Sequence, residues 1–417
     1  MSVGELPAHG EAAEVGVSTR RRAGTVPDVV APPPRHPRFP LFDGLRAVAV
    51  LCVLLVHVPG SSGLPEPLSR FFGHLDLGVA IFFVISGFLL YRPFIAARAG
   101  GASAPAVGAY TKRRFLRIFP AYWLALAVLT ILPGTVGVEG SNPVPQLFLL
   151  HALPVFGGPT CYGFGTPCDL AQTWSLVAEL TFYAVLPLYA FAGLWLTRGL
   201  RLQSWMWVQL GLLAGLGVVS VLLRFVILDP AAWTPRTAIG FWLWFACGMG
   251  LAVASVALGE PKRRPRLIQL LASWPSAPWL LAIAIYVGLS LWLPRFGLTR
   301  QETMINYIAF ALIAFLLVVP AVFVSGHGLP RRVLTNPLVA WIGLISYGIF
   351  LWHFAIAYEL GPDLSFGVAL IVTLALSVAV AAASYYLVER PILRFKYRPI
   401  GDLVGRIRRN PQEEGSA

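Results

Sequence analysis

The chain has 417 residues, of which 57% are hydrophobic and only 12% charged, and its mean hydropathy is +0.71. A soluble domain carries roughly 25% charged residues, so this composition excludes an ordinary soluble globular protein and predicts an all-α, polytopic membrane protein. The net charge of +13 is common in proteins that bind nucleic acids, but here the basic residues follow a membrane topology instead.

Residues 1–40 are predicted to form a disordered cytoplasmic tail. They contain no apolar stretch of the kind found in a secretory signal peptide, and they are rich in Pro, Gly, Ala and charged residues. The membrane domain is predicted to occupy residues 41–398. A second disordered cytoplasmic tail is expected over residues 399–417.

About ten transmembrane helices are predicted from the apolar segments. Their ranges are 43–59, 77–97, 119–137, 173–195, 205–227, 237–258, 279–293, 304–324, 337–358 and 366–388. With the N-terminus inside, all but five of the 32 Lys and Arg fall on the cytoplasmic side. The five exceptions are Arg70, Arg224, Arg236, Arg295 and Arg300. This distribution predicts that both termini are cytoplasmic, that the location is a bacterial inner membrane, and that nucleic acid is not a partner.

The first predicted span carries two ionisable side chains, Arg46 and His57, which are eleven residues apart. In a helix this spacing corresponds to about 16 Å, roughly half the hydrocarbon core of a bilayer. Ionisable groups inside a span are costly to bury and mark candidate functional sites. The alternative is that Arg46 anchors the helix at the inner face and that His57 is a hydrogen-bonded packing residue.

Ser86, in the second predicted span, is a candidate nucleophile by residue type. No Gly stands two residues before it, so it does not belong to a G-x-S-x-G elbow. The Ser86-Gly87 pair is predicted instead to allow a close helix approach or to line a cavity.

A basic segment precedes the third predicted span. Residues 100–118 are predicted to form a short interfacial helix that enters the span at Pro120. Arginines in this region and in the first span form a cluster that can hold phosphates through bidentate hydrogen bonds. The cluster consists of Arg46, Arg113, Arg114 and Arg117. Membrane topology alone also accounts for such arginines.

The longest predicted outer loop, residues 138–172, is long enough to fold over an outer opening. It contains Cys161 and Cys168, which form either a disulfide or two free thiols. A lone pair of cysteines is too little for a zinc site, and no metal site is predicted.

His57, Glu179 and His353 come from separate predicted spans and share the outer half of the membrane. An imidazole and a carboxylate at matching depth can form a pair of base and orienting group. The alternative is three unrelated interfacial residues. The sequence contains no P-loop, no G-x-G-x-x-G after a strand and no H-E-x-x-H, which disfavours nucleotide hydrolysis and zinc-protease chemistry.

Six segments stand out in order along the chain: FDGLRAVAVLCVLLVH, GVAIFFVISGFLL, KRRFLRIFPAYW, QTWSLVAELTFYAVLP, ISYGIFLWH and VERPILRF. Together they resemble the acyltransferase-3 family of polytopic membrane acyltransferases, over residues 42 to about 395. Any one segment is unspecific, whereas the ordered set is specific. Some relatives carry an added SGNH-type esterase domain, and this chain is expected to be a stand-alone form.

The resemblance implies an enzyme that takes an acyl group, usually acetyl, from cytoplasmic acyl-CoA. Typical acceptors are hydroxyls on extracytoplasmic glycans, and sometimes small molecules such as macrolides. The family's motifs map onto Arg46 and His57, onto Arg113, Arg114 and Arg117 with Tyr122 beyond them, and onto Trp174, Ser175 and Glu179. His57 is then the expected base or transient acyl carrier.

In the expected mechanism, the arginines hold the phosphates of acyl-CoA. The pantetheine arm, comparable in length to the 16 Å estimate, delivers the thioester to His57, which Glu179 orients. His57 either deprotonates the acceptor hydroxyl or takes the acyl group first. Candidate oxyanion or acceptor contacts are Ser86, Tyr122, Trp174, Ser175, Tyr347 and His353.

A transporter or flippase is the competing class, because buried His57 and Glu179 can also serve a proton relay. A scaffold without chemistry is disfavoured, since it has little reason to bury these two groups. Cell-wall polysaccharide, glycolipid and secreted small molecule all stay open as acceptors.

Overall fold

The computed structural model describes residues 41–60, 63–131, 144–151, 153, 168–227, 236–258, 266, 269, 273–323, 328–360 and 364–397. The two predicted tails, residues 1–40 and 399–417, lie outside this part of the chain, and so does Cys161 of the candidate disulfide. The fold is described for the remaining residues.

Helices make up the regular structure of the described residues, which confirms the all-α prediction. The first half contains α1 (Leu41–Val56), α2 (Leu68–Gly73), η3 (His74–Asp76), α3 (Leu77–Ala99), α4 (Val107–Ile131), α5 (Val144–Leu147), η5 (Cys168–Thr173), α6 (Trp174–Leu196), α7 (Leu202–Leu222) and η6 (Leu223–Ile227). The second half contains α8 (Trp242–Ala257), α10 (Ala277–Trp292), α11 (Arg300–Phe323), α12 (Leu329–Leu334), α13 (Pro337–Leu344), α14 (Ser346–Glu359), α15 (Phe366–Ser384), η9 (Tyr385–Glu389), α16 (Arg390–Leu393) and η10 (Arg394–Tyr397).

Six helical stretches of the described chain are long and apolar enough to cross a membrane, and a bent pair of helices makes a seventh candidate. The six are Leu68–Ala99, Val107–Ile131, Leu170–Leu196, Leu202–Ile227, Arg300–Phe323 and Phe366–Leu393. Each of the ten predicted ranges contains helix, but α1, α8 and α10 have only 16 residues each. The chain is thus a multi-pass membrane protein, while the count of ten and the cytoplasmic termini stay predictions.

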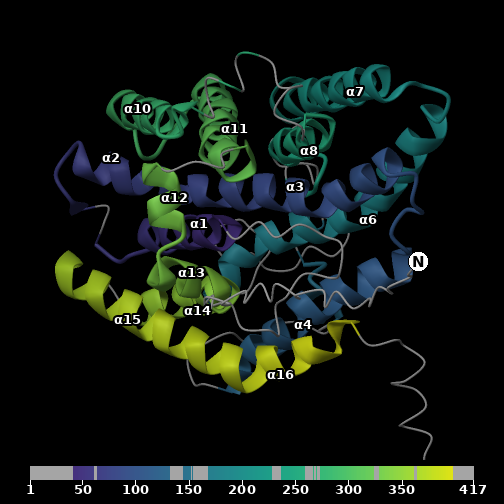
Figure 1. Ribbon diagram of the computed structural model, residues 1–417. Coiled ribbons are helices and arrows are strands. Elements are labelled where there is room, and N and C mark those ends of the chain that lie inside the picture. Colours follow the sequence, from purple (N-terminus) through teal and green to yellow (C-terminus); the bar gives the residue numbers. More distant parts are fainter. Residues whose placement is uncertain are drawn as a thin grey trace, which may run out of the picture.

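Helix α1 lies near the centre of the bundle, with α7, α8, α10 and α11 on one side of α3 and α13, α14 and α15 on the other (Figure 1). It contacts α3, α11, α12, α13 and α14, and its Leu45, Val50 and Leu54 are completely buried. A helix that is apolar on all sides belongs in such an interior position. Arg46 and His57 are therefore held by protein on several sides rather than by lipid.

Helices α3 and α8 form the most extensive helix pair of the fold, and two glycines lie at their crossing. A Cβ atom at Gly87 would overlap the carbonyl oxygen of Phe245, and one at Gly248 would overlap that of Val84. Small residues allow two membrane helices to approach at backbone distance, where van der Waals packing holds them. The prediction that Gly87 serves a close helix approach is confirmed.

The predicted span 337–358 is broken rather than continuous. Helices α13 and α14 meet at Ile345 with a bend of 71°. No proline lies near the break, although Gly343 packs directly against the backbone of Asp43 in α1. Irregular backbone is tolerated at membrane depth where protein surrounds it or where it lines a cavity, so the break marks a place of interest.

The predicted boundary at Pro120 is wrong. Helix α4 is continuous from Val107 to Ile131 and contains Pro120 in its interior, so the basic segment and the apolar segment form one element. A proline inside a membrane helix removes one backbone hydrogen bond but is tolerated where neighbours satisfy the freed carbonyl. The arginines before Pro120 are consequently placed by the same helix that enters the apolar core.

Replacing Gly248 with Ala is expected to lower the free energy of unfolding by roughly 1–3 kcal/mol, because the new methyl group overlaps backbone that cannot move aside. Gly211→Ala in α7 is the matched control, since a Cβ there meets no atom within 4 Å. Thermal unfolding in detergent measures both variants. Equal stability of the two would contradict the backbone-contact crossing.

Candidate functional site

A cavity of about 100 Å³ lies where α1, α3, α4, α6 and α14 meet, and it is large enough for a few water molecules. Most of the polar residues predicted for the site line it: Arg46, Ser86, Arg114, Arg117, Ser175, Glu179 and Tyr347. Apolar side chains of α3, such as Phe82 and Leu89, complete the wall. The structure thus joins residues from five helices into one polar chamber.

Three guanidinium groups reach this cavity. Nη1 of Arg46 forms an ion pair with Oδ1 of Asp43 at 2.7 Å, one turn earlier in α1. Cζ of Arg114 lies 5.8 Å from the ring centre of Tyr183, and Cζ of Arg117 lies 5.9 Å from that of Tyr347. Aromatic faces of this kind hold a cation without consuming its hydrogen-bond donors.

The buried Nε of Arg114 has no hydrogen-bond partner among the described residues. A buried guanidinium donor without a partner is costly, which suits a site that receives an anion. Arg114 and Arg117 are three residues apart in α4, a spacing that allows both side chains to reach the same cavity. Arg113 does not belong to the cavity lining.

Glu179 lies inside this cavity rather than beside His57. Its Oε1 accepts hydrogen bonds from Oγ of Ser86 at 2.7 Å and from the Tyr183 hydroxyl at 2.5 Å. The expected pair of His57 and Glu179 is therefore not formed, and the prediction that Glu179 orients the imidazole is corrected. Tyr183 was missed by the sequence reasoning, although its position four residues after Glu179 places it on the same helix face.

His57 pairs instead with His353. Nδ1 of His57 lies 3.2 Å from Nε2 of His353, and the two ring centres are 5.2 Å apart. His353 is completely buried and His57 partly buried. The two histidines that the sequence placed in the same half of the membrane are thus in direct contact, with His353 as a partner of His57.

The end of α1 explains the position of His57. Pro59 disfavours helical backbone at Val58, so α1 ends at Val56 and leaves its last carbonyl groups without the usual helical donors. The backbone N–H of His57 donates to Leu54, and Nδ1 of its ring lies 2.8 Å from the carbonyl oxygen of Val53. The imidazole therefore closes the end of its own helix and is fixed in direction.

Gln172, which the sequence reasoning did not single out, braces α14 beside His353. Its Nε2 donates to the carbonyl oxygens of Phe350 at 3.2 Å and Leu351 at 2.9 Å. Nδ1 of His353 lies 2.9 Å from that same Phe350 oxygen. The only signal in the sequence was its place in the QTWSLVAEL segment.

Phe350 lies between the cavity and the histidine pair. Its side chain lines the cavity, and its ring centre is 6.1 Å from that of His353. Neither His57 nor His353 belongs to the lining of this cavity, which therefore does not itself join the arginines to the histidine pair.

Tyr122 and Trp174, which were candidate contacts of the acceptor or the oxyanion, have partners outside the cavity. The buried Tyr122 hydroxyl donates to the carbonyl oxygen of Gln146 at 2.5 Å, and the Trp174 ring packs against Phe241 at 5.3 Å. Neither residue lines the cavity. Within the described ranges, no group of three or more His, Cys, Asp or Glu side chains is arranged to hold a metal ion.

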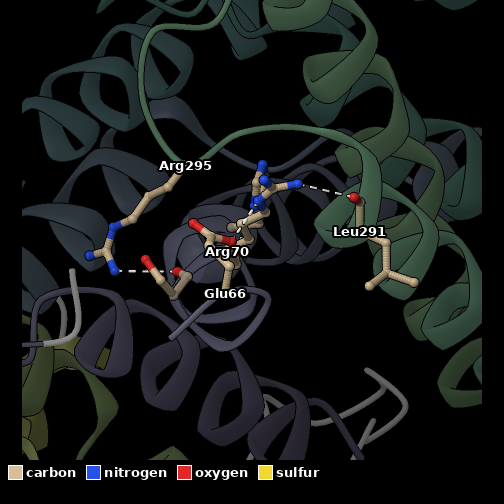
Figure 2. A network of polar contacts seen from close by, with 6 residues as sticks. Glu66, Arg70, Leu291 and Arg295 are labelled. Atoms are coloured by element: carbon tan, nitrogen blue, oxygen red, sulfur yellow. Dashed lines mark hydrogen bonds and ion pairs between the residues drawn. The ribbon is translucent and has the colours of Figure 1, made fainter. Parts of the chain in front are cut away.

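Arg70 and Arg295, two of the five arginines that the topology left on the outer side, connect neighbouring elements of the fold (Figure 2). Arg70 forms an ion pair with Glu66 at 2.6 Å and donates to the carbonyl oxygen of Leu291, near the end of α10, at 3.2 Å. Arg295 donates to the carbonyl oxygen of Ser69 at 3.3 Å. These contacts tie α2 to the end of α10 and to the loop that follows it.

The chain is similar in sequence to known acyltransferases. A family model described as an acyltransferase domain matches residues 40–389. The peptidoglycan O-acetyltransferase OatA of Listeria monocytogenes is 25% identical over 376 residues, which cover 85% of this chain and 55% of OatA. The acyltransferase MdmB of Streptomyces mycarofaciens is 26% identical over 414 residues, which cover 88% of this chain and 95% of MdmB.

The lengths of these relatives differ. The chain spans about half of OatA and of the Bacillus subtilis relative YrhL, to which it is also 25% identical, with 55% of each covered. The exopolysaccharide production protein ExoZ of Rhizobium meliloti is 29% identical over 327 residues, with 76% of this chain and 89% of ExoZ covered. No solved structure matches the chain.

Gln172→Ala is expected to lower the free energy of unfolding by roughly 1–3 kcal/mol, since it removes both hydrogen bonds that brace α14 in a dry interior. Gln203→Ala, at an exposed position of α7, is the control and is expected to change stability by less than about 0.5 kcal/mol. Thermal unfolding of both variants in the same detergent checks this. A Gln172 variant as stable as the control would show that the brace is dispensable.

Proposed function

The chain belongs to the acyltransferase family that this domain model describes, and we propose that it moves an acyl group, in the simplest case acetyl, from acyl-CoA to an acceptor hydroxyl outside the cytoplasm. The acceptor class is an envelope glycan, a glycolipid or a small molecule. The relatives, which include a peptidoglycan O-acetyltransferase and an acyltransferase, support this choice. They do not favour a transporter or flippase.

The observation that carries the proposal is the meeting of three guanidinium groups in one cavity at the base of α1, the helix that ends at His57. Phosphate and pyrophosphate groups are the ligands that such arginines bind best, through charge-assisted hydrogen bonds. The unpartnered Nε of Arg114 offers one such donor. A phosphate group of acyl-CoA therefore suits the arginine side of the cavity in charge and in hydrogen bonding.

The second half of the proposal concerns the bond that changes. His57 takes the proton of the acceptor hydroxyl while the hydroxyl oxygen attacks the thioester carbonyl carbon. The carbon–sulfur bond breaks, and the leaving thiolate of CoA receives that proton from the imidazolium. If His57 takes the acyl group first, CoA leaves as the acyl group moves to the imidazole, and the acceptor hydroxyl then takes the acyl group from the imidazole. Between these two steps the acyl group is bound to the protein.

Glu179 has a different role from the one expected from sequence. Held by Ser86 and Tyr183, it keeps these two hydroxyl groups in fixed directions at the cavity wall. One carboxylate among three guanidinium groups also limits how much negative charge the cavity accepts. The smaller net positive charge of the cavity favours reversible binding of a donor that carries phosphate groups, rather than binding so tight that the anion is not released.

His57→Ala is expected to abolish acyl transfer, because no other described side chain at the end of α1 replaces the imidazole. Purified protein in lipid vesicles is incubated with labelled acetyl-CoA, and release of free CoA and retention of label on the protein are followed. A deletion strain complemented with this variant should lack the acylated envelope material that the wild-type gene restores, as read by mass spectrometry.

His74→Gln serves as the control for this experiment. Its Nδ1 also lies 2.8 Å from a backbone oxygen, that of Arg70, but it belongs to η3 and not to the proposed site. It should keep transfer activity. Full activity of a folded His57→Ala protein would remove the catalytic role of this residue.

Arg114→Ala is expected to raise the Michaelis constant for acetyl-CoA roughly 10- to 100-fold, with a smaller effect on turnover, because it removes charge-assisted hydrogen bonds to the donor. Arg113→Ala, one residue away but outside the cavity lining, should change this constant far less. Initial rates over a range of acetyl-CoA concentrations separate the two. Equal effects would mean that the whole basic surface, and not this cavity, attracts the donor.

A further inference from the structure

The contact between the two buried imidazoles determines which nitrogen of each ring carries a hydrogen. Nδ1 of His353 lies 3.1 Å from the carbonyl oxygen of Ile349 and 2.9 Å from that of Phe350. Carbonyl oxygens only accept hydrogen bonds, so Nδ1 of His353 must be the donor. In the neutral ring, Nε2 of His353 then carries a lone pair and acts as an acceptor.

The same reasoning applies to His57. Its Nδ1 faces two acceptors, the carbonyl oxygen of Val53 at 2.8 Å and Nε2 of His353 at 3.2 Å. The single hydrogen on Nδ1 can be shared between these two acceptors, whereas the other tautomer would bring a lone pair against each of them. Nε2 of His57 is thus the ring nitrogen left with a free lone pair.

We propose that His353 is a positioning residue that holds His57 in the tautomer whose Nε2 is unprotonated. Nε2 of His57 is then the atom that takes the proton of the acceptor hydroxyl, or the acyl group. The catalytic consequence rests on the proposed function, whereas the tautomer itself does not. His353 has the part that a buried carboxylate has in a Ser-His-Asp triad, with a neutral acceptor in its place.

The surroundings of His353 make this arrangement stable. The residue is completely buried, and Gln172 donates to the same Phe350 carbonyl oxygen that His353 uses. The ring of Phe354 packs edge-on against His57 at 5.0 Å between ring centres. Apolar rings surround the two imidazoles, whose hydrogen-bond partners are each other and the helix carbonyl oxygens. The tautomer of His57 with a lone pair on Nδ1 is therefore expected to be less populated by about tenfold or more.

The first test determines the tautomer directly. The full chain, labelled at its histidine nitrogens, is reconstituted in lipid, and heteronuclear NMR distinguishes a protonated from an unprotonated ring nitrogen. The His57→Gln spectrum identifies the His57 signals. The expected result is a protonated Nδ1 and an unprotonated Nε2 for His57, with the His74 signals unchanged as an internal reference. A protonated Nε2 in the neutral wild-type ring would overturn the proposal.

The second test separates positioning from simple packing. His353→Phe keeps an aromatic ring but removes the acceptor, whereas His353→Gln supplies a side-chain oxygen that can accept from Nδ1 of His57. Turnover of the Phe variant is expected to fall roughly 10- to 100-fold, as for other partners that orient a functional imidazole. The Michaelis constant for acetyl-CoA should stay within about twofold of the wild-type value. The Gln variant should regain much of the turnover.

Thermal unfolding of both variants shows whether each is folded. Unchanged turnover of a folded Phe variant, or a folded Gln variant no better than Phe, would overturn the positioning role. If the Phe variant does not fold, the positioning role is tested by the tautomer of His57 in the wild-type protein and by the turnover of the Gln variant. Active wild-type protein with the opposite tautomer contradicts this inference alone, whereas inactive wild-type protein with the expected tautomer contradicts the proposed function and with it the catalytic consequence.

Discussion

The absence of water inside a membrane is the constraint on which the rest of this structure depends. Every polar atom at that depth needs a partner from the protein, since an unpaired group costs several kcal/mol. The end of α1 meets this requirement with the ring of His57, and within α14 the side chains of Gln172 and His353 both contact the carbonyl oxygen of Phe350. In both places an imidazole of the histidine pair is one of the groups that contact backbone carbonyl oxygens.

Hydropathy predicted much of the helical fold, because long apolar stretches in lipid have few alternatives to helix. It did not predict the bend at Ile345, two residues after Gly343 packs against the backbone of Asp43 in α1. It also placed a boundary at Pro120, where tertiary contacts keep α4 continuous. Both errors arise where neighbouring helices override local preference.

The structure brings together many of the residues that the sequence singled out, but in other pairs than expected. Depth along a span can be estimated from residue counting, which placed His57, Glu179 and His353 in the same half of the membrane. Rotation about the helix axis cannot be counted in the same way, because each residue turns the helix by about 100°. Glu179 consequently faces Ser86 and Tyr183, His57 faces His353, and Arg113 leaves the cavity that Arg114 lines.

Helix α1 also fixes the distance between Arg46 and His57. Because His57 directly follows the last residue of α1, its separation from Arg46 is set mainly by the rise of a single helix and depends little on shifts of other helices. In the proposed reaction, the length of α1 then sets how long a donor must be to reach from the arginines to His57. A compact acyl phosphate that engages the same guanidinium groups would leave its carbonyl carbon stranded far short of the imidazole, whereas a donor with a long flexible arm spans the gap. Selection by reach would thus accompany selection by charge.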